Sequence, residues 1–485
     1  MANEAQPMHV VVFPFLAHGH MIPALDIARL FATRDVKSTI ITTPVNAPIF
    51  TKAIEHGNRT KDLNINVEIF RFPSQEVGLP EGCENREQVS GWGMSQLFFR
   101  ATEMLQEQLE QYLEKARPTC LIADTFYPWA TESTSSFNIP RLVFHGSGYF
   151  PLCAQDNILQ YAPFKNISSD DEMCTLTPFP DKVAFLRTQV PKHFWGDEDN
   201  AHRKKMELIR KSELESYGVI VNSFYELESE YADFFRKELG RKTWHVGPVS
   251  LINRSFEEKA LRGKQASIDE YECLAWLDSK KPCSVVYVSF GSITTFIASQ
   301  LHEIANALEN SGQNFIWVVR NVENEDWLPA MFEQRMDGKG LIIRGWAPQI
   351  LILKHEAVGA FVTHCGWNST LESISAGVPT VTWPMFADQF YIEKLVTQIL
   401  KVGVSVGAKK WSMVPSAEHV IKSEAIEKGL MEILKGEMAE QMRHRAKELK
   451  EMAYNAVAEG GSSQSELTKL ITELRSYHTQ SRESS

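Results

Sequence analysis

Short apolar runs alternate with longer amphipathic stretches along the first half of the chain. The runs are HVVVFPF (9–15), STIIT (38–42), CLIAD (120–124), RLVFH (141–145) and GVIVN (218–222). Continuous apolar runs of this length are typical of strands that are covered on both faces, as in a parallel sheet. The amphipathic stretches 21–33 and 94–115 predict helices between them. The first half of the chain therefore predicts a parallel α/β sheet.

The same pattern starts again after a polar, mixed-charge stretch, INRSFEEKALRGKQASIDE. A helix is predicted over 299–311. The second set of predicted strands is SVVYVSF (284–290), FIWVV (315–319), LIIRG (341–345), AVGAFVT (357–363) and VPTVTW (378–383). Repeated strand–helix units on both sides of a polar stretch predict an α/β fold of two doubly wound domains that face each other across a cleft.

The domain limits follow from these patterns. We expect an N-terminal domain over 1–240, a linker over 241–270 and a C-terminal domain over 271–460. The final segment, 461–485, contains a predicted helix over 463–474 and a polar tail that we expect to fray.

Composition and charge narrow the function classes. Of the 485 residues, 43% are hydrophobic and 23% are charged, which is ordinary for a globular protein and excludes a largely disordered chain. The net charge of -11 argues against nucleic acid and anionic lipid as partners. No apolar stretch approaches the roughly 20 residues of a membrane span. The N-terminus, MANEAQP, lacks the features of a signal peptide.

The seven cysteines are scattered and never spaced as CxxC. That pattern is typical of free thiols in a reducing compartment, so we expect a cytoplasmic protein. No exposed heptad repeat predicts an oligomer, and we expect a monomer.

Unusual residues follow three of the predicted strands in the second half. The three segments are 346–349 (WAPQ), 364–369 (HCGWNS) and 384–389 (PMFADQ). In a parallel sheet these segments share one edge, where ligands bind. The aromatic face of the first segment would suit a base, and the helix N-terminus of the second would suit a diphosphate. The Asp–Gln pair of the third would suit a sugar.

Each of these residues also fits a structural role. Ser369 and Glu372 match a capping box that ends at Gly377, and Asp388 could cap the next helix. Trp346 could simply be a packing residue. The functional interpretation depends on all three segments sharing one edge.

Residues 346–389, WAPQILILKHEAVGAFVTHCGWNSTLESISAGVPTVTWPMFADQ, resemble the donor-binding box of plant family-1 UDP-sugar glycosyltransferases. FPFLAHGHMIPALDIARL, LIADTFYPWA, VNSFYELE, WHVGP and VSFGS are similar to segments of the same family. Among its members, the chain most resembles the group that acts on flavonoids, coumarins and related phenolics. The resemblance implies the GT-B fold of two Rossmann-like domains, with the final helix returning to the N-terminal domain.

The resemblance also implies how the donor is bound. Trp346 would stack on the uracil, Ala347 and Gln349 would lie beside it, and Glu372 would accept hydrogen bonds from the ribose. Gln389, rather than His, at the last position of the box implies that the donor is UDP-glucose. The resemblance implies that the diphosphate contacts His364, Asn368, Ser369 and Ser292. It implies that the sugar contacts Trp367, Asp388 and Gln389.

Transfer to a phenol needs a base, and a histidine is suited to this at neutral pH. His20 follows the strand 9–15 and lies at a helix N-terminus, where the helix dipole disfavours imidazolium. Asp124 closes the strand 120–124 and could orient the imidazole ring. The resemblance identifies His20, not His18, as the catalytic histidine and Asp124 as its partner. The alternative is that the two residues are a helix cap and a turn residue.

Other motifs in the chain could in principle serve different chemistry. His18 and His20 could begin a zinc site, but no clustered third ligand is evident. Asp197 and Asp199 resemble a metal-holding pair but lie in an acidic stretch that we interpret as a solvated loop. His145 is interpreted as a core or supporting residue. The chain contains neither a GxGxxG after its first strand nor a GxxxxGK[ST], which disfavours a dehydrogenase or a P-loop enzyme.

The acceptor pocket should be apolar and lined by aromatic residues. Five aromatic residues at strand ends or in loops are candidates: Phe15, Trp92, Phe126, Phe150 and Phe194. A wide aromatic pocket predicts tolerance of many phenols.

These observations predict an inverting O-glucosyltransferase that transfers glucose from UDP-glucose to small phenolic acceptors such as flavonoids, coumarins, stilbenes and simple phenols. UDP-glucose is the co-substrate, and we expect no cofactor and no metal. One alternative is the same fold with a terpenoid or steroid acceptor, or with another UDP-sugar. A second is a sugar-nucleotide-binding protein without catalysis, for which His20 and Asp124 would be unnecessary.

Overall fold

The structure is a computed structural model that describes residues 8–195, 200–320, 327–414 and 416–483, except the side chains of 480–483. The chain divides into two units that are interleaved along the sequence. Unit 1 comprises residues 1–149, 204–263 and 455–485, and unit 2 comprises residues 150–203 and 264–454.

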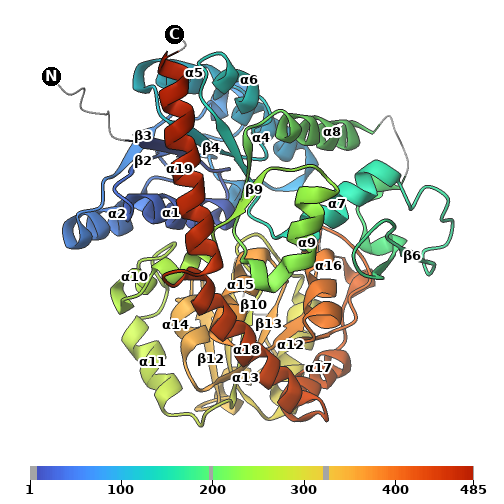
Figure 1. The fold of residues 1–485 in the computed structure, drawn as a ribbon. Coiled ribbons are helices and arrows are strands. Elements are labelled where there is room, and N and C mark those ends of the chain that lie inside the picture. Colours follow the sequence, from blue (N-terminus) through green and yellow to red (C-terminus); the bar gives the residue numbers. More distant parts are fainter. Residues whose placement is uncertain (1–7, 196–199, 321–326, 415, 484–485) are drawn as a thin grey trace. The chain divides into compact units, whose positions relative to one another are not determined.

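Unit 1 is built on a seven-stranded sheet in which every strand pair is parallel. The strand order is β3-β2-β1-β4-β5-β8-β9, and β2, β3, β4 and β9 are labelled in Figure 1. The strands are β1 (His9–Phe13), β2 (Lys37–Thr42), β3 (Ile65–Ile69), β4 (Cys120–Asp124), β5 (Arg141–Phe144), β8 (Gly218–Val221) and β9 (Thr243–His245).

Helices cover both faces of this sheet, as the side chains of β1 show. Val10 and Val12 pack in one core with α1 (His18–Ala32) and α19 (Ser462–Glu483), and Val11 and Phe13 pack in another with α4 (Gly91–Glu103) and α5 (Gln106–Ala116). Alternate residues of one strand therefore fill two cores, which explains its uninterrupted apolar sequence. The other helices of the unit are α2 (Pro48–Lys61), α3 (Ser74–Val77), α6 (Ala130–Ser135), α8 (Ala201–Leu214, which begins in unit 2), α9 (Tyr225–Lys237) and α10 (Phe256–Ala260).

Unit 2 has a six-stranded parallel sheet with the order β12-β11-β10-β13-β14-β15. Val286 and Val288 pack in a core with α12 (Ala298–Ser311) and α17 (Ser423–Lys435). Val285 and Tyr287 pack in a second core with α11 (Glu270–Asp278) and α14 (Gln349–Lys354). The strands are β10 (Val285–Ser289), β11 (Asn314–Val319), β12 (Gly340–Arg344), β13 (Val358–Thr363), β14 (Thr380–Thr382) and β15 (Gly403–Ser405), with a separate antiparallel hairpin of β6 (Met173–Thr175) and β7 (Ala184–Leu186). The helices are α7 (Tyr149–Tyr161), α11 (Glu270–Asp278), α12 (Ala298–Ser311), α13 (Phe332–Arg335), α14 (Gln349–Lys354), α15 (Trp367–Ala376), α16 (Gln389–Lys394), α17 (Ser423–Lys435) and α18 (Ala439–Val457, whose last residues belong to unit 1).

The mixed α/β class with two parallel sheets is as predicted, and each predicted strand is present within a few residues. The prediction of one helix over 94–115 is wrong, because the chain forms α4 and α5 with a break at Met104 and Leu105. Leu105 is fully buried, so the apolar periodicity continues through the break and conceals it. The sequence did not indicate the short strands β3, β9 and β15.

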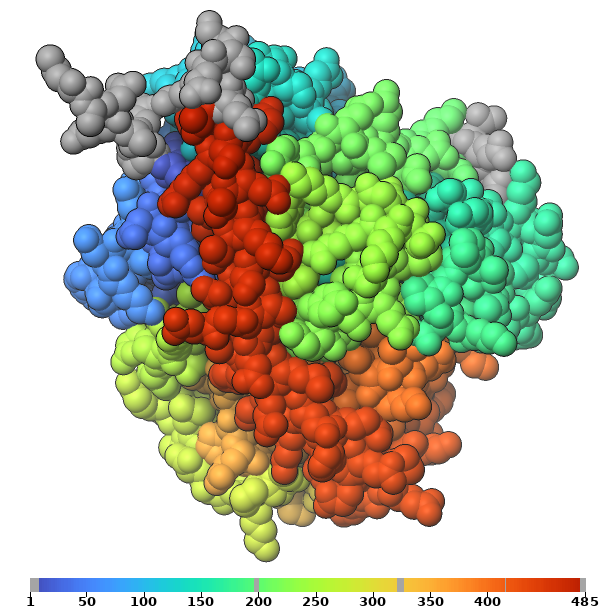
Figure 2. All heavy atoms as spheres, viewed as in Figure 1, coloured from blue at the N-terminus to red at the C-terminus, as the bar shows by residue number. Residues whose placement is uncertain are grey.

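The last helix is longer than predicted. α19 runs to Glu483, beyond the helix predicted over 463–474, and the fraying of the polar tail stays a prediction. Tyr477 packs edge-on against Tyr217 with ring centroids 5.4 Å apart, which holds this turn of the helix. The outer side of α19 lies at the surface, while Leu467, Leu470 and Leu474 are buried in the unit 1 core (Figures 1 and 2).

No helix among the described residues is both long enough and apolar enough to cross a membrane.

Candidate functional site

A histidine and an aspartate meet at the carboxyl edge of the unit 1 sheet. α1 begins five residues after β1 ends, which puts His20 in the first turn of the helix. Asp124 is the last residue of β4, which pairs in parallel with β1. Nδ1 of His20 lies 2.6 Å from Oδ2 of Asp124. Two neighbouring strand ends thus bring the two predicted catalytic residues together.

The surroundings of this pair define its hydrogen-bonding pattern. Asp124 is buried, and the His20 side chain is 20% exposed. The other carboxylate oxygen, Oδ1, accepts a hydrogen bond from the backbone N–H of Phe126 at 3.1 Å. Because an ionised carboxylate only accepts hydrogen bonds, His20 donates from Nδ1 and its Nε2 can accept a proton. The pair therefore has the geometry of a general base that is oriented by a carboxylate.

His18 does not take part in this pair. Its Nδ1 lies 2.5 Å from Oε1 of Glu87, and the ring is buried. Among the described residues there is no group of three or more His, Cys, Asp or Glu side chains that could hold a metal ion. Asp197 and Asp199 lie outside the described residues.

His145 contacts a buried carboxylate. Its Nε2 contacts Oε2 of Glu213, whose Oε1 is 2.8 Å from Nε of Arg241. Burial opposes ionisation of Glu213, but His145 and Arg241 together lower its pKa to about 2. His145 is therefore engaged in a buried ion-pair cluster.

Phenylalanine rings surround His20. The ring centroids of Phe15 and Phe126 lie 5.6 and 5.7 Å from that of His20, and the two phenylalanines are 4.8 Å apart. Phe99, on α4, stacks on Phe15 at 5.6 Å and lies 5.9 Å from Phe126. Phe99 was missed by the sequence analysis because it lies inside a predicted helix next to Phe98, which is a core residue. Phe126 and Phe99 are half-buried, so they retain surface for a ligand.

The other aromatic candidates lie elsewhere in the two units. Trp92 is 57% exposed near the start of α4. Phe150 belongs to unit 2, is fully buried and packs edge-on against Phe179 at 5.4 Å. Phe194 is also buried in unit 2, with His193 4.4 Å away. A fully buried ring such as Phe150 presents no surface to a ligand.

In unit 2, the segments after β12 and β13 are joined by hydrogen bonds. Nε2 of Gln349 donates to Oε2 of Glu372 at 2.7 Å and to Oγ of Ser369 at 3.1 Å. The hydroxyl of Tyr287 donates to Oε1 of Gln349 at 3.3 Å. Three residues of the predicted donor box therefore form one polar cluster, centred on the Gln349 amide.

Trp346 is fixed through its backbone. Its N–H donates to Oγ of Ser267 at 2.9 Å, and its carbonyl oxygen accepts from the Ser267 N–H at 2.8 Å. The ring is half-exposed, and the Arg320 guanidinium lies 4.6 Å from its centroid. Ala347, next in the chain, is buried. Arg320 was missed by the sequence analysis, although a charged residue directly after β11 was a signal for this edge.

His364 occupies a narrow space between two glycines. A methyl group on Gly291 would lie 2.6 Å from the His364 ring, and one on Gly366 would lie 2.4 Å from its Nε2. Burial, together with the charge of Arg320, lowers the pKa of His364 to about 4. Nδ1 of this ring is buried and makes no hydrogen bond to any described residue. Ser292, next to Gly291, is half-buried after β10.

The capping-box interpretation of Ser369 and Glu372 is wrong. α15 begins at Trp367, so that Ser369 is the third residue of the helix, and the N-cap is Gly366, which offers no side chain. The N-terminal N–H groups of α15 are thus not capped by a side chain at this position. Asn368, in the first turn, is half-buried, while Trp367 is buried. The helix does end at Gly377, in the left-handed conformation, as predicted.

The Asp388–Gln389 pair begins α16. The Asp388 side chain makes no capping hydrogen bond, so the capping interpretation is not supported. Oε1 of the buried Gln389 accepts hydrogen bonds from the N–H groups of Met385 and Phe386 at 2.8 and 3.0 Å. The carboxamide oxygen of Gln389 therefore holds its own loop in place.

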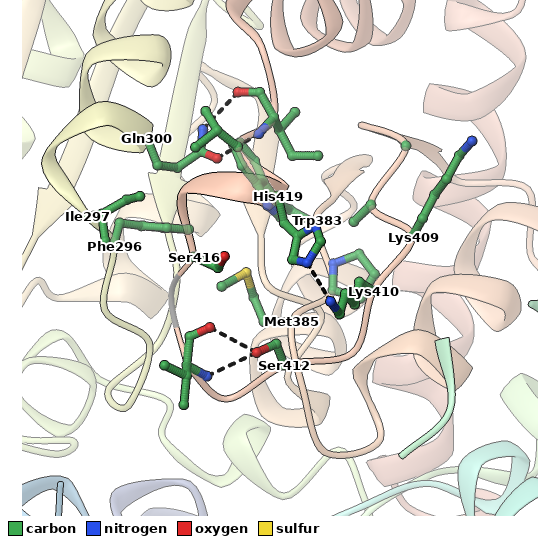
Figure 3. Close-up of a pocket in the computed structure, with 16 residues that line it drawn as sticks. Phe296, Ile297, Gln300, Trp383, Met385, Lys409, Lys410, Ser412, Ser416 and His419 are labelled. Carbon is green, nitrogen blue, oxygen red and sulfur yellow. Dashed lines mark hydrogen bonds between the residues drawn. The ribbon is translucent and has the colours of Figure 1, made fainter. Parts of the chain in front are cut away.

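A cavity of about 230 Å³ lies beside the same loop (Figure 3). Its polar lining groups bind one another: the Gln300 amide exchanges hydrogen bonds with the backbone of Ile421, and Nζ of Lys410 donates to Nε2 of His419 at 2.6 Å. The apolar lining includes Phe296, Ile297, Trp383 and Met385.

Known proteins resemble the chain over nearly its whole length. Residues 202–444 match the family described as UDP-glucoronosyl and UDP-glucosyl transferase. A scopoletin glucosyltransferase of Nicotiana tabacum is 53% identical over 473 residues, which cover 97% of this chain and 98% of that protein. An anthocyanin 3'-O-beta-glucosyltransferase of Gentiana triflora is 52% identical over 479 residues, which cover 97% and 99% of the two chains.

The fold is also similar to a solved structure. The crystal structure of Glycyrrhiza uralensis UGT73P12 complexed with glycyrrhetinic acid 3-O-monoglucuronide superposes with a TM-score of 0.92 at 39% sequence identity, covering 99% of this chain and 98% of that chain.

Proposed function

Since the chain belongs to the UDP-glucoronosyl and UDP-glucosyl transferase family, we propose that it transfers glucose from UDP-glucose to a hydroxyl group of small phenolic acceptors. The products are β-O-glucosides and UDP. The observation that carries the proposal is the hydrogen bond of 2.6 Å between His20 and Asp124 at a strand-end position. The names of the two plant relatives support glucose as the sugar and phenols as the acceptors.

In the proposed reaction, the acceptor hydroxyl lies at Nε2 of His20. Nε2 takes the proton as the acceptor oxygen attacks the anomeric carbon, and the bond from that carbon to the UDP oxygen breaks in the same displacement. Asp124 holds the ring by its Nδ1–H and stabilises the imidazolium that forms. A single displacement inverts the α linkage of the donor to β, so no covalent enzyme intermediate is needed.

The donor is proposed to bind in unit 2. Trp346 offers its half-exposed ring to the uracil, with Arg320 against that ring as a further contact. The Gln349–Glu372–Ser369 cluster opens toward the ribose, and Ser292, His364 and Asn368 hold the diphosphate near the N-terminus of α15. Trp367, Asp388 and the amide nitrogen of Gln389 contact the sugar, and Ala347 completes the base pocket. The orphaned Nδ1 of His364 supports a ligand at this position.

The test is UDP release from UDP-glucose in the presence of EDTA, with a panel of flavonols, coumarins, stilbenes, simple phenols and triterpenoids. Release that depends on phenols and survives the chelator supports the proposal. A His20→Ala variant should bind UDP normally and lose transfer. If the wild-type protein binds UDP but releases none from UDP-glucose with any acceptor, it is a sugar-nucleotide-binding protein instead.

The triterpenoid in the panel has a specific reason. The Glycyrrhiza uralensis structure contains a glycyrrhetinic acid glucuronide. Turnover of triterpenoids but not of phenols would favour the same reaction with a terpenoid acceptor. Replacing Gln389 with His and measuring the ratio of UDP-glucose to UDP-galactose use would test the donor.

We also propose that the enzyme works without metal as a cytoplasmic monomer. All seven cysteines are free thiols, as suits a reducing compartment. Size-exclusion chromatography with light scattering would test the oligomeric state, and a mass of twice the chain would contradict it.

A further inference from the structure

A lysine lies against the aromatic residues that surround His20. Lys205, on α8, places its Nζ 3.4 Å from the ring centroid of Phe99. Phe99 in turn contacts Phe15 and Phe126, the two phenylalanines next to His20. All of these residues belong to unit 1. One aromatic ring therefore separates the Lys205 ammonium from the two rings that contact the proposed base.

The ammonium group of Lys205 is partly removed from water and forms no ion pair with a described carboxylate. The side chain is half-buried, and among the described residues no hydrogen bond or ion pair of its Nζ is found. Burial lowers the pKa of Lys205 to about 8, although the exposed carboxylate of Glu103 opposes the shift. The face of Phe99 attracts the cation only weakly compared with a direct charge-assisted hydrogen bond. A partly desolvated, unpaired cation beside a reaction site indicates a binding function.

We propose that Lys205 forms an anion-binding subsite in the acceptor region, and that the enzyme prefers phenolic acceptors that carry a carboxylate on the side of the ring remote from the reacting hydroxyl. This inference rests on the function proposed above. A carboxylate is favoured over a second phenol group because it is ionised at neutral pH, whereas a phenol with a pKa near 10 is not.

The chemistry of the subsite follows from the three phenylalanines and the lysine. The acceptor ring packs on Phe126 and Phe99, with its hydroxyl at Nε2 of His20. The carboxylate then replaces lost water at Lys205 with a charge-assisted hydrogen bond. Because Lys205 touches no reacting atom, it contributes to acceptor binding and orientation, not to proton transfer.

The experiment compares two acceptors in the same enzyme preparation, 4-hydroxycinnamate and its methyl ester. The quantity measured is the ratio of kcat/KM for the acid to that for the ester, which does not depend on the fraction of active protein. Lys205→Met should lower this ratio about tenfold or more, mainly through the KM of the acid, as expected for the loss of a charge-assisted hydrogen bond. Lys205→Arg keeps the charge and should retain most of the ratio.

The matched control is Lys211→Met. Lys211 is exposed on the same helix, with only a 3.8 Å ion pair to Glu215, and its loss should leave the ratio unchanged. A ratio in Lys205→Met that equals or exceeds that of the wild type would overturn the subsite. If the wild-type enzyme glucosylates neither acceptor nor any other phenol, it is the proposed function that fails.

Discussion

In the proposed mechanism, Asp124 has two tasks that a neutral side chain cannot perform together. It would hold the Nδ1–H of His20, whose Nδ1 lies 2.6 Å from Oδ2, and its negative charge would stabilise the imidazolium formed during transfer. An asparagine at this position retains the size of the side chain but loses the charge.

We therefore expect Asp124→Asn to lower kcat by about 10²- to 10⁴-fold, the range typical of lost general-base assistance. UDP affinity, measured by calorimetry, should not change, because the donor residues lie in unit 2. Glu81→Gln, which alters an exposed acid of unit 1, serves as the control. Normal turnover by Asp124→Asn would contradict the role of the aspartate.

Gly366 controls the position of His364. Its backbone φ of -63° suits any residue, so a substitution there acts through the space beside it and not through backbone strain. An added methyl group would lie 2.4 Å from Nε2 of His364 and would force the ring to move.

Gly366→Ala should weaken UDP binding by roughly 10- to 100-fold, the equivalent of one hydrogen bond to a charged group. Gly93→Ala is the control, because a methyl group there meets nothing within 4 Å. Calorimetric titration with UDP measures both variants. Unchanged affinity in Gly366→Ala would exclude His364 from the diphosphate site.

At the scale of elements, the segment after β9 is attached to α1 by a buried charged network. Nη2 of Arg29 contacts Oε1 of Glu258 at 2.6 Å, and its Nη1 donates to Oδ1 of Asn253. Asp26 accepts from Nδ2 of Asn253 and from Nε of Arg262, both at 2.8 Å. α1 also carries His20 in its first turn. The network therefore anchors the helix that positions the proposed base.

Glu258→Gln should lower the free energy of unfolding by about 3 kcal/mol, because it leaves the buried Arg29 without its counter-charge. Urea denaturation measures the loss. Glu257→Gln, at an exposed neighbouring position, should have little effect. A loss no larger than that of Glu257→Gln would show that the network does not stabilise α1.

The effect of Glu258 should depend on pH with a defined sign. Burial opposes its ionisation, but Lys61 and two backbone N–H groups lower its pKa to about 2. A pKa that is lower in the folded state than the ordinary value near 4.5 stabilises the protein above pH 4.5. The difference between wild type and Glu258→Gln should therefore be constant from pH 8 to 5 and shrink below pH 4.5.

At the scale of the molecule, histidines that are wholly or partly removed from water in both units predict acid sensitivity. Burial lowers the pKa of His9, His193, His245 and His364 to about 4, from an ordinary value of 6.5. Between these values the unfolded chain binds protons that the folded chain does not. The sign is therefore a loss of stability as the pH falls from 6.5 toward 4.

We expect the urea midpoint to fall steadily between pH 7 and 5 and to change little from these groups between pH 7.5 and 9. His9→Gln should make the acid slope shallower, since it removes one of the four sites, whereas the exposed His444→Gln should not. A midpoint that is independent of pH from 7 to 5 would contradict a neutral state of these histidines in the folded protein.

Much of the fold was determined by local sequence. Continuous apolar runs predicted the parallel sheets, because such runs are typical of strands that are covered on both faces. In the structure, β1 indeed fills two cores with alternate residues. The residue types in 346–389 identified the family, because a binding loop carries its chemistry in consecutive positions. Short strands such as β9 and β15 were not predicted, because three residues carry too little periodicity.

Tertiary structure decided what distant segments do to one another. The sequence placed His20 and Asp124 at strand ends, but only the pairing of β1 with β4 brings side chains 104 positions apart to 2.6 Å. Phe99 lies among the aromatic rings around His20, whereas Phe150 is buried. The reason is that packing, not residue type, selects which side of a helix faces a ligand. Lys205 became significant only through what lies against it. The physical reason is the same throughout: residue chemistry and periodicity are local, whereas burial, side-chain direction and charge pairing depend on segments that meet only in the folded chain.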